Sequence, residues 1–141
     1  MTALTSPPDI SGLVLPMDAW TQPFWDAAAR KELMVPRCGS CGTYRWPPGP
    51  FCPECRSQAC EWVPAGPARI YSYTILRQTS ASDGKTERHI APALVEFPQA
   101  GGIRIVAALV DTPLDAIAIG AALDLRWVPV GNTHVPQFTI R

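Results

Sequence analysis

Two closely spaced cysteine pairs constrain the fold of this chain more than any other feature. Cys38 and Cys41 form the first pair, and ten residues later Cys52 and Cys55 form the second. Each Cys-x-x-Cys pair is typical of a knuckle that turns two thiolates toward one ion. Four soft sulfur ligands suit zinc, and a complete set of four leaves no open coordination position. We therefore expect one structural zinc ion held by these four residues.

Other chemistries fit the same spacing. Iron in a rubredoxin-like site uses the same arrangement of four sulfurs, although nothing else in the chain indicates redox chemistry. Disulfides are disfavoured because the N-terminus shows no secretory signal pattern. Cys60 follows the last ligand by five residues and is interpreted as a small buried hydrophobic residue rather than a reactive thiol.

Composition narrows the class of protein. The chain has 141 residues, 47% of them hydrophobic, which is typical of a globular fold of one or two small units. Twelve basic and twelve acidic residues give no net charge, so neither nucleic acid nor an anionic membrane surface is favoured as a partner. No apolar run approaches the roughly 20 residues that span a bilayer. We expect a cytoplasmic protein.

The chain divides into three predicted parts. Residues 1–20 are rich in proline and lack periodicity, so we expect a flexible or draped arm. Residues 21–63 are predicted to contain a helix over 21–33 followed by the zinc ribbon. Thr21 is placed to cap this helix and Pro23 fits its first turn. The aromatic pair Phe24 and Trp25 packs either on this chain or against another protein.

Alternating apolar and polar residues after Gly66 predict β-strands, so residues 64–141 are expected to form the third part. The sequence Asp83-Gly84 signals a turn, and residues 111–120 form a connector with space for a short helical turn. Five short strands with one longer connector fit a small closed barrel of the OB type. The expected strands are 68–77, 91–97, 103–110, 121–130 and 137–140. The predicted fold class is mostly β, with an N-terminal helix, a four-cysteine rubredoxin-like ribbon and a five-stranded OB barrel.

An ordered series of motifs runs through most of the chain. It begins with Phe24-Trp25 and Leu33, continues through both cysteine pairs with Pro47-Pro48 between them, and reaches Trp62. It then includes Ile70-Tyr71-Ser72-Tyr73-Thr74, Pro92 with Leu94-Val95-Glu96, and Ile119-Gly120 before Leu123. Over roughly residues 20–130 this series resembles the zinc-ribbon plus OB-fold family once labelled only as a domain of unknown function. Members of that family accompany thiolases, thiolase-like aldolases and MaoC-type hydratases.

The resemblance implies a non-catalytic subunit in a hetero-oligomer with a thiolase-superfamily enzyme. It also implies that the chain helps to form an acyl-CoA site, with a CoA thioester as the ligand of the complex. The motif residues are mainly structural in this family, so the resemblance supplies no catalytic residue. The proline-rich arm and Cys60 depart from common members and leave the partner-facing surface undefined.

The residues themselves include few candidate catalytic groups. The two histidines, His89 and His134, fall in predicted loops, and no Ser-His-Asp or Cys-His arrangement is indicated. An aromatic and cationic segment between the cysteine pairs, with Tyr44, Arg45 and Trp46, is predicted either to bind ligand or to form the small core of the ribbon. Further candidate cations for a CoA ester are Arg37, Arg69, Arg77 and Arg104. The alternative function is a module that binds single-stranded nucleic acid through an OB barrel, although the charge balance opposes it.

Overall fold

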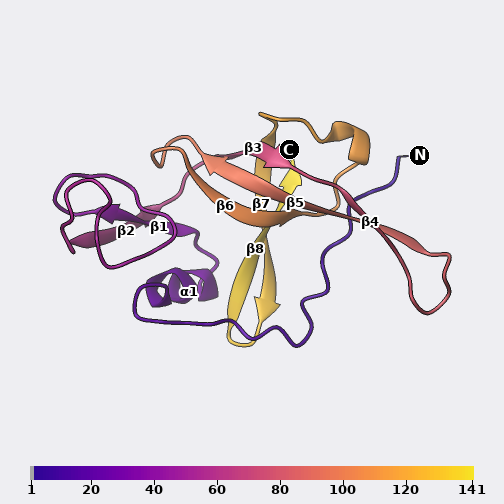
Figure 1. The fold of residues 1–141 in the computed structure, drawn as a ribbon, viewed down its shortest axis with the longest axis horizontal. Helices are drawn as coiled ribbons and strands as arrows, with labels where there is room; N and C mark the ends of the chain where they lie inside the picture. Colours follow the sequence, from indigo (N-terminus) through magenta and orange to yellow (C-terminus); the bar gives the residue numbers. More distant parts are fainter. Residues whose placement is uncertain (1) are drawn as a thin grey trace.

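The computed structural model describes residues 2–141. Its elements follow one another as a helix, a two-stranded ribbon and a barrel (Figure 1). They are α1 (Gln22–Ala29), β1 (Met34–Cys38), β2 (Cys60–Pro64), β3 (Ala68–Tyr73), β4 (Leu76–Thr79), β5 (Glu87–Phe97), β6 (Ile103–Leu109), the 3-10 turn η1 (Leu114–Ala116), β7 (Ala122–Val130) and β8 (Thr133–Ile140).

Five strands close the barrel that the alternation predicts. The order is β3-β7-β8-β6-β5, and β5 pairs back onto β3, so the sheet has no free end among these strands. All pairings are antiparallel except a short parallel contact between β6 and β8, where Leu109 faces Phe138. Closure removes the exposed edges that five apolar strands would otherwise present. The predicted mostly β fold with one helix and an OB barrel is confirmed.

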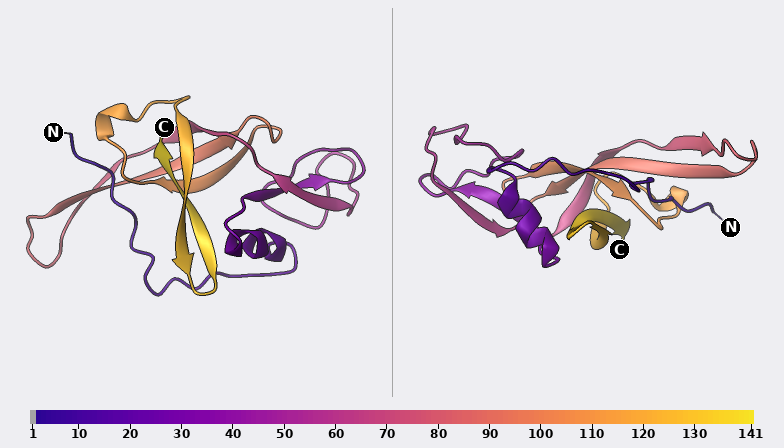
Figure 2. Two further views of the ribbon diagram at one scale, coloured as in Figure 1. Left: turned by 180° about the vertical axis from the view of Figure 1, so that it is seen from behind. Right: turned by 90° about the horizontal axis from the view of Figure 1, so that it is seen from below.

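Three strand predictions need correction, and two of them are too short at the start, because the strand predicted at 91–97 begins at Glu87 and the one predicted at 137–140 begins at Thr133. The predicted strand 68–77 ends at Tyr73, and a separate strand β4 follows that the sequence analysis did not anticipate. Strand β4 pairs with the first part of β5 and forms a hairpin that projects from the barrel (Figure 2). Asp83 closes this hairpin by accepting hydrogen bonds from the amides of Lys85 and Thr86, as its turn signal predicts. All four residues of β4 are exposed, which explains why no alternation marks it.

The helix is shorter than the predicted 21–33, because it ends at Ala29. Its buried face carries Phe24, Ala27 and Ala28, as the pattern indicates. Thr21 does not cap the helix with its side chain. Instead, the Asp18 carboxylate accepts hydrogen bonds from the backbone amides of Trp20 and Thr21. The carboxylate therefore satisfies amides at the entry to the helix, which a threonine was expected to do.

Strand β8 fixes the helix to the barrel. The Thr133 hydroxyl donates to the carbonyl of Trp25 at 2.7 Å, and Nδ1 of His134 donates to the carbonyl of Ala28 at 2.9 Å. His134 also packs edge-on against Trp127. His134 is thus half-buried in a strand rather than in a loop, and its imidazole has a structural role. His89 was also predicted in a loop, but it lies in β5.

One hydrophobic core runs through the ribbon and the barrel. Val35 of β1 is fully buried in the same cluster as the barrel residues Val95, Phe97 and Phe138. Phe97 and Phe138 meet edge-to-face with ring centroids 6.2 Å apart. The ribbon therefore packs on the barrel as part of its core.

The N-terminal arm lies along the barrel and is hydrogen-bonded to it over its first residues. Thr5 is buried and exchanges backbone hydrogen bonds with Asp111 and Thr112, and the Ser6 amide donates to the carbonyl of His89. The arm then crosses the β7–β8 hairpin near its tip and reaches α1 (Figure 1). Its first part is thus tied down by specific pairing.

Candidate functional site

The four predicted ligands come together at the end of β1 and in the loop that follows. The Sγ atoms of Cys38 and Cys55 lie 3.6 Å apart, and those of Cys41 and Cys52 lie 3.5 Å apart. All four sulfurs fall within 4.8 Å of one another. A tetrahedral ion with metal–sulfur bonds of about 2.3 Å requires sulfur–sulfur edges of about 3.8 Å, so the cluster fits one zinc ion. The arrangement of the four cysteines for one zinc ion is confirmed.

Backbone amides prepare the cluster for thiolates. The Cys41 and Ser40 amides point at Cys38 Sγ from 3.5 Å and 3.4 Å, and the Glu54 amide points at Cys52 Sγ from 3.4 Å. Hydrogen bonds from the amides of Cys41 and Ser40 lower the pKa of Cys38 to about 6. The Ser57 amide would lower the pKa of Cys55, but the neighbouring sulfurs outweigh it and raise that pKa to about 11. Because the pKa of Cys55 is raised, all four cysteines become thiolates together only when a cation lies among them.

Cys60 was predicted to be a small buried residue, and this is wrong. Its side chain is exposed on β2, directly opposite Cys38 in the ribbon ladder. Directly opposite residues of an antiparallel pair share one face, so Cys60 lies next to Cys38, yet its own side chain stays exposed. Cys60 therefore lies beside the metal centre without belonging to it.

Arg45 is enclosed within the ribbon, although it was predicted as a ligand-binding residue. It is 4% exposed, and its guanidinium donates to the carbonyls of Gly49, Ser57 and Ala59 at 3.1, 3.4 and 3.0 Å. These bonds tie the loop between the knuckles to the chain that enters β2. The structure thus favours the ribbon-core interpretation of Arg45 over ligand binding.

We predict that Arg45→Ala lowers the free energy of unfolding by about 2–3 kcal/mol. Three hydrogen bonds from a charged group, each contributing about 1.5–3 kcal/mol, are lost, but water replaces part of this because Gly49 and Ser57 are only partly buried and Ala59 is exposed. Chemical denaturation followed by tryptophan fluorescence measures this loss. Arg37→Ala is the control: Arg37 pairs with Glu61 at 2.6 Å on a partly exposed surface, and such pairs contribute about 0–1 kcal/mol. Equal effects of the two substitutions would contradict the bracing role of Arg45.

Tyr44 lies at the junction of ribbon and barrel. Its ring packs on the turn between β5 and β6, where Gly101 has a φ of +66°. A Cβ at Gly101 would approach the Tyr44 ring to 3.0 Å, so the turn needs glycine for both its conformation and this contact. Tyr44 was also predicted to bind ligand, and the structure places it in this packing contact.

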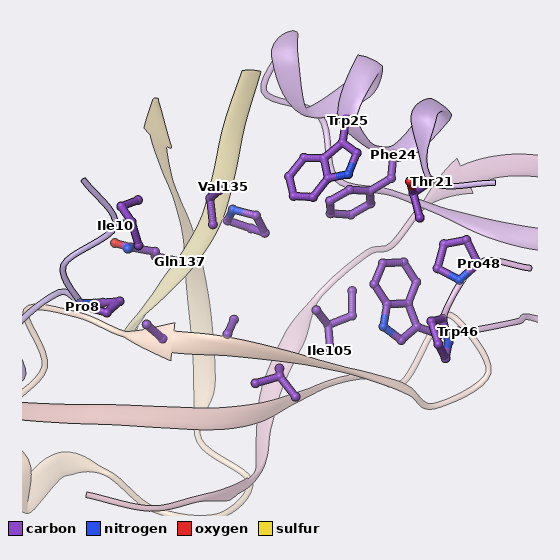
Figure 3. A pocket seen from close by; sticks show the side chains of 15 residues that line it. Pro8, Ile10, Thr21, Phe24, Trp25, Trp46, Pro48, Ile105, Val135 and Gln137 are labelled. Atoms are coloured by element: carbon purple, nitrogen blue, oxygen red, sulfur yellow. The ribbon is translucent and has the colours of Figure 1, made fainter. Parts of the chain in front are cut away.

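An apolar groove lies between the helix, the ribbon and the barrel (Figure 3). Its volume is about 370 Å³, and fifteen residues line it, none of them charged. Phe24 and Trp25 of α1 face it from one side and Trp46 from another, while strands β6 and β8 form its floor (Figure 3). The lining residues are Pro8, Ile10, Thr21, Phe24, Trp25, Trp46, Pro47, Pro48, Ile105, Val106, Ala107, Ala108, Val135, Pro136 and Gln137.

The groove exists because β6 and β8 diverge. The two strands pair only where Leu109 meets Phe138. The rings of Trp46 and Phe24, with centroids 5.4 Å apart, pack together along one side of the resulting gap. Of the three predicted ligand-binding residues, only Trp46 lines the groove. Sequence reasoning did not identify Val135 or Ile105 as lining residues, because no local pattern shows where two strands of a barrel separate.

A cluster of one carboxylate and two arginines lies on the outer face of the barrel. Glu96 sits between cross-strand partners Arg69 and Arg104 and accepts hydrogen bonds from Arg69 Nε at 2.8 Å and Arg104 Nε at 3.3 Å. The Glu96 side chain is only 9% exposed. Hydrogen bonds from Arg69 hold the pKa of Glu96 below its usual value, and those from Arg104 add to this, while burial opposes both.

We expect the Glu96→Gln variant to be less stable than the native chain, with a difference that depends on pH. Because the pKa of Glu96 is lower in the folded state, its stabilisation is complete above the unfolded value of about 4.3 and is lost as pH falls through the folded value. Thermal unfolding of both proteins from pH 7 to pH 3 measures this. Acid release of the metal affects both proteins alike, so the difference in melting temperature isolates the carboxylate. A difference that stays constant down to pH 3 would contradict the interpretation.

Among residues 2–141, no helix has the length and apolar character needed to cross a bilayer.

Comparisons with known proteins match nearly the whole chain. Residues 25–61 match the model of the ChsH2 rubredoxin-like zinc ribbon domain, and residues 62–128 match that of the ChsH2 C-terminal OB-fold domain. A solved structure described as the Ltp2-ChsH2(DUF35) aldolase is similar over 90% of this chain and 98% of that chain, with 31% identity and a TM-score of 0.76. A DUF35-family protein of unknown function from Sulfolobus solfataricus has 16% identity over 89% of this chain and 85% of that chain, with a TM-score of 0.64, which shows a shared fold.

One curated relative is similar in sequence. The probable enoyl-CoA hydratase alpha subunit of Thermomonospora curvata is 36% identical over an alignment of 124 residues, and the match covers 81% of this chain. The present chain spans only 38% of that relative's length.

Proposed function

Since the chain belongs to the ChsH2 family of zinc-ribbon and OB-fold proteins, we propose that it is a non-catalytic accessory subunit of a thiolase-superfamily enzyme and helps to form that enzyme's acyl-CoA site. The observation that carries this proposal is the likeness to the ChsH2 chain of the Ltp2-ChsH2(DUF35) aldolase, which covers 98% of that chain. In this proposal the chain works in a cytoplasmic hetero-oligomer.

The apolar groove supports the proposal that the ligand is an acyl group. Pockets that bury small molecules typically start at about 300 Å³ and are mainly apolar, which matches the 370 Å³ groove. Besides the indole N–H groups of Trp25 and Trp46, the groove offers only Thr21 and Gln137 as polar side chains. It therefore suits a hydrocarbon chain better than a phosphate. In the proposed complex the acyl group occupies the groove, and the charged CoA moiety lies outside it.

The titratable side chains of this chain are held in structural contacts, which supports a non-catalytic role. His134 is engaged by the helix, and Glu96 is engaged by two arginines. The sulfur cluster suits a closed structural ion rather than a catalytic one. The reacting groups would therefore come from the partner.

The partner is proposed to be an aldolase-like or thiolase-like enzyme. The similarity to the Ltp2-ChsH2(DUF35) aldolase structure, with 31% identity and a TM-score of 0.76, supports this choice. In the proposed division, residues 21–63 and 64–141 carry the ribbon and the barrel, with residues 1–20 as an arm.

Co-expression with a thiolase-superfamily enzyme from the same organism tests the proposal. We expect a stable complex on gel filtration and acyl-CoA turnover only when both chains are present. An isolated chain that turns over acyl-CoA, or one that never joins the enzyme, would overturn the proposal.

A groove-filling variant tests the acyl site within that complex. Ala108→Leu should lower kcat/KM increasingly as the acyl chain lengthens while the complex stays intact, because the larger side chain occupies the groove. Ala81→Leu, at the exposed hairpin tip, is the matched control and should have no effect. Identical kinetics for both variants would remove the groove from the proposed site.

A further inference from the structure

A group of five residues on the outer face of β3, β5 and β6, here called the docking face, lies apart from the metal centre and meets the groove only at Val106. It consists of Arg69, Tyr71, Glu96, Arg104 and Val106. Arg69 and Arg104 are the cross-strand neighbours of Glu96 on its two sides. Because neighbouring strands lie about 4.8 Å apart, these side chains form one continuous surface.

The docking face presents a fixed positive charge. Two guanidinium groups share one carboxylate, so one positive charge remains. The carboxylate lies beneath them at 9% exposure, whereas the Arg69 and Arg104 side chains are 52% and 45% exposed. The negative charge is thus buried, and the positive charge faces outward.

Arg104 is held in place before any partner arrives. Its Nε donates to Glu96, and its guanidinium lies over the Tyr71 ring, 3.5 Å from the centroid. Within residues 2–141 its two terminal nitrogens form no hydrogen bond, so they remain free to donate outward. A side chain ordered in advance loses less conformational entropy on binding, which favours a tight contact.

Apolar surface adjoins the charge. Val106 lies two residues from Arg104 on β6, so both side chains point to the same face of the strand. It is 71% exposed, and Tyr71 is also exposed. Arginine and tyrosine beside an apolar side chain are typical of the centre of a protein interface. Val106 also lines the groove, so the docking face reaches the groove's edge.

We propose that the docking face binds an acidic surface of the partner enzyme, with a carboxylate of that enzyme set against Arg69 and Arg104. The inference rests on the proposed function, because it assigns the surface by which the chain joins its enzyme. A protein carboxylate fits better than a free phosphate because both arginines stand on an open strand face and neither lines the groove. Binding here would bring the enzyme to the edge of the groove.

Charge reversal tests the proposal in the complex co-expressed with the thiolase-superfamily enzyme. Arg104→Glu should weaken the affinity at least tenfold by calorimetry, since it sets two negative charges against each other. Raising the salt concentration should weaken the native complex and narrow this difference. The control is Arg77→Glu: Arg77 pairs with His89, seven residues along β5 from Glu96 and hence about 23 Å away.

Val106→Glu provides a second variant that leaves the Glu96 network intact. Its side chain is exposed, so the chain should fold normally while its affinity for the enzyme falls at least tenfold. Leu76→Glu on the projecting β4 is its matched control, and zinc content and melting temperature verify folding of all four variants.

The outcomes separate the two proposals. If the native chain does not bind the enzyme, the proposed function fails. If the native chain binds and both docking-face variants bind equally well, the docking face is wrong while the proposed function stands. Full affinity with impaired use of acyl-CoA by Arg104→Glu would also overturn the docking face, because Arg104 would then serve the ligand instead.

Discussion

Replacing Cys38 by serine is expected to release the zinc ion and unfold the ribbon. Cys38 supplies one of four sulfurs and is 1% exposed in the cluster. Binding of a structural zinc ion contributes about 10–16 kcal/mol of apparent free energy, which is also folding free energy for the site. A serine hydroxyl cannot replace the thiolate as a soft ligand. Metal analysis of the purified variant should give less than one zinc per chain, and chelation of the native protein should have the same effect.

The loss should extend to the groove and to partner binding. Val35 and Trp46, on either side of the first knuckle, pack against the barrel core, and Trp46 walls the groove. An unfolded ribbon would therefore remove one side of the groove.

The control for this prediction is Cys60→Ser. Cys60 is exposed and lies outside the cluster, so the variant should retain one zinc ion and the native melting temperature. A Cys38→Ser chain that assembles normally with full zinc, or a freshly purified native chain without metal, would contradict the structural role of the ion.

Truncating Phe138 to alanine is expected to cause the largest loss of stability in the barrel. Phe138 is fully buried, packs edge-to-face on Phe97, and lies on the strand that joins β6 to β7. Removing a buried phenylalanine side chain costs about 3–5 kcal/mol, because transfer free energy is lost and a cavity remains. For a chain of this size we expect the melting temperature to fall by about 10 °C or more.

Val14→Ala is the control for the barrel prediction. Val14 lies in the arm and is 84% exposed, so its truncation should change stability by less than about 0.5 kcal/mol. Calorimetric melting of both variants in the presence of zinc measures the difference. If the Phe138→Ala protein has the same melting temperature as the native chain, this ring does not stabilise the barrel.

The sequence predicted the metal centre accurately because the ligands are close together in the chain. The spacing of two Cys-x-x-Cys pairs requires knuckle geometry whatever surrounds it, and the sulfurs do converge. The strands predicted at 103–110 and 121–130 lie within one residue of their observed bounds. Strand β4 was not predicted because both of its faces meet solvent, so burial imposes no alternation on it.

The roles of individual side chains were harder to predict because they depend on distant partners. Arg45 was a plausible cation for a ligand until the fold placed three carbonyls around it. Glu96 follows the alternation of β5, yet it is covered because arginines arrive from β3 and β6. Pairing of strands far apart in the sequence creates such surroundings, and the residue types alone do not specify it.

By itself, the amino-acid sequence determined the zinc site, the mostly β character and the family resemblance, because these depend on local spacing and periodicity. Only the tertiary structure decided that the ribbon shares the barrel's core, that β6 and β8 separate to open an apolar groove, and that two arginines stand over one buried carboxylate. Each of these features arises from contacts between segments that are remote in the chain, and the closure of the barrel sets their geometry.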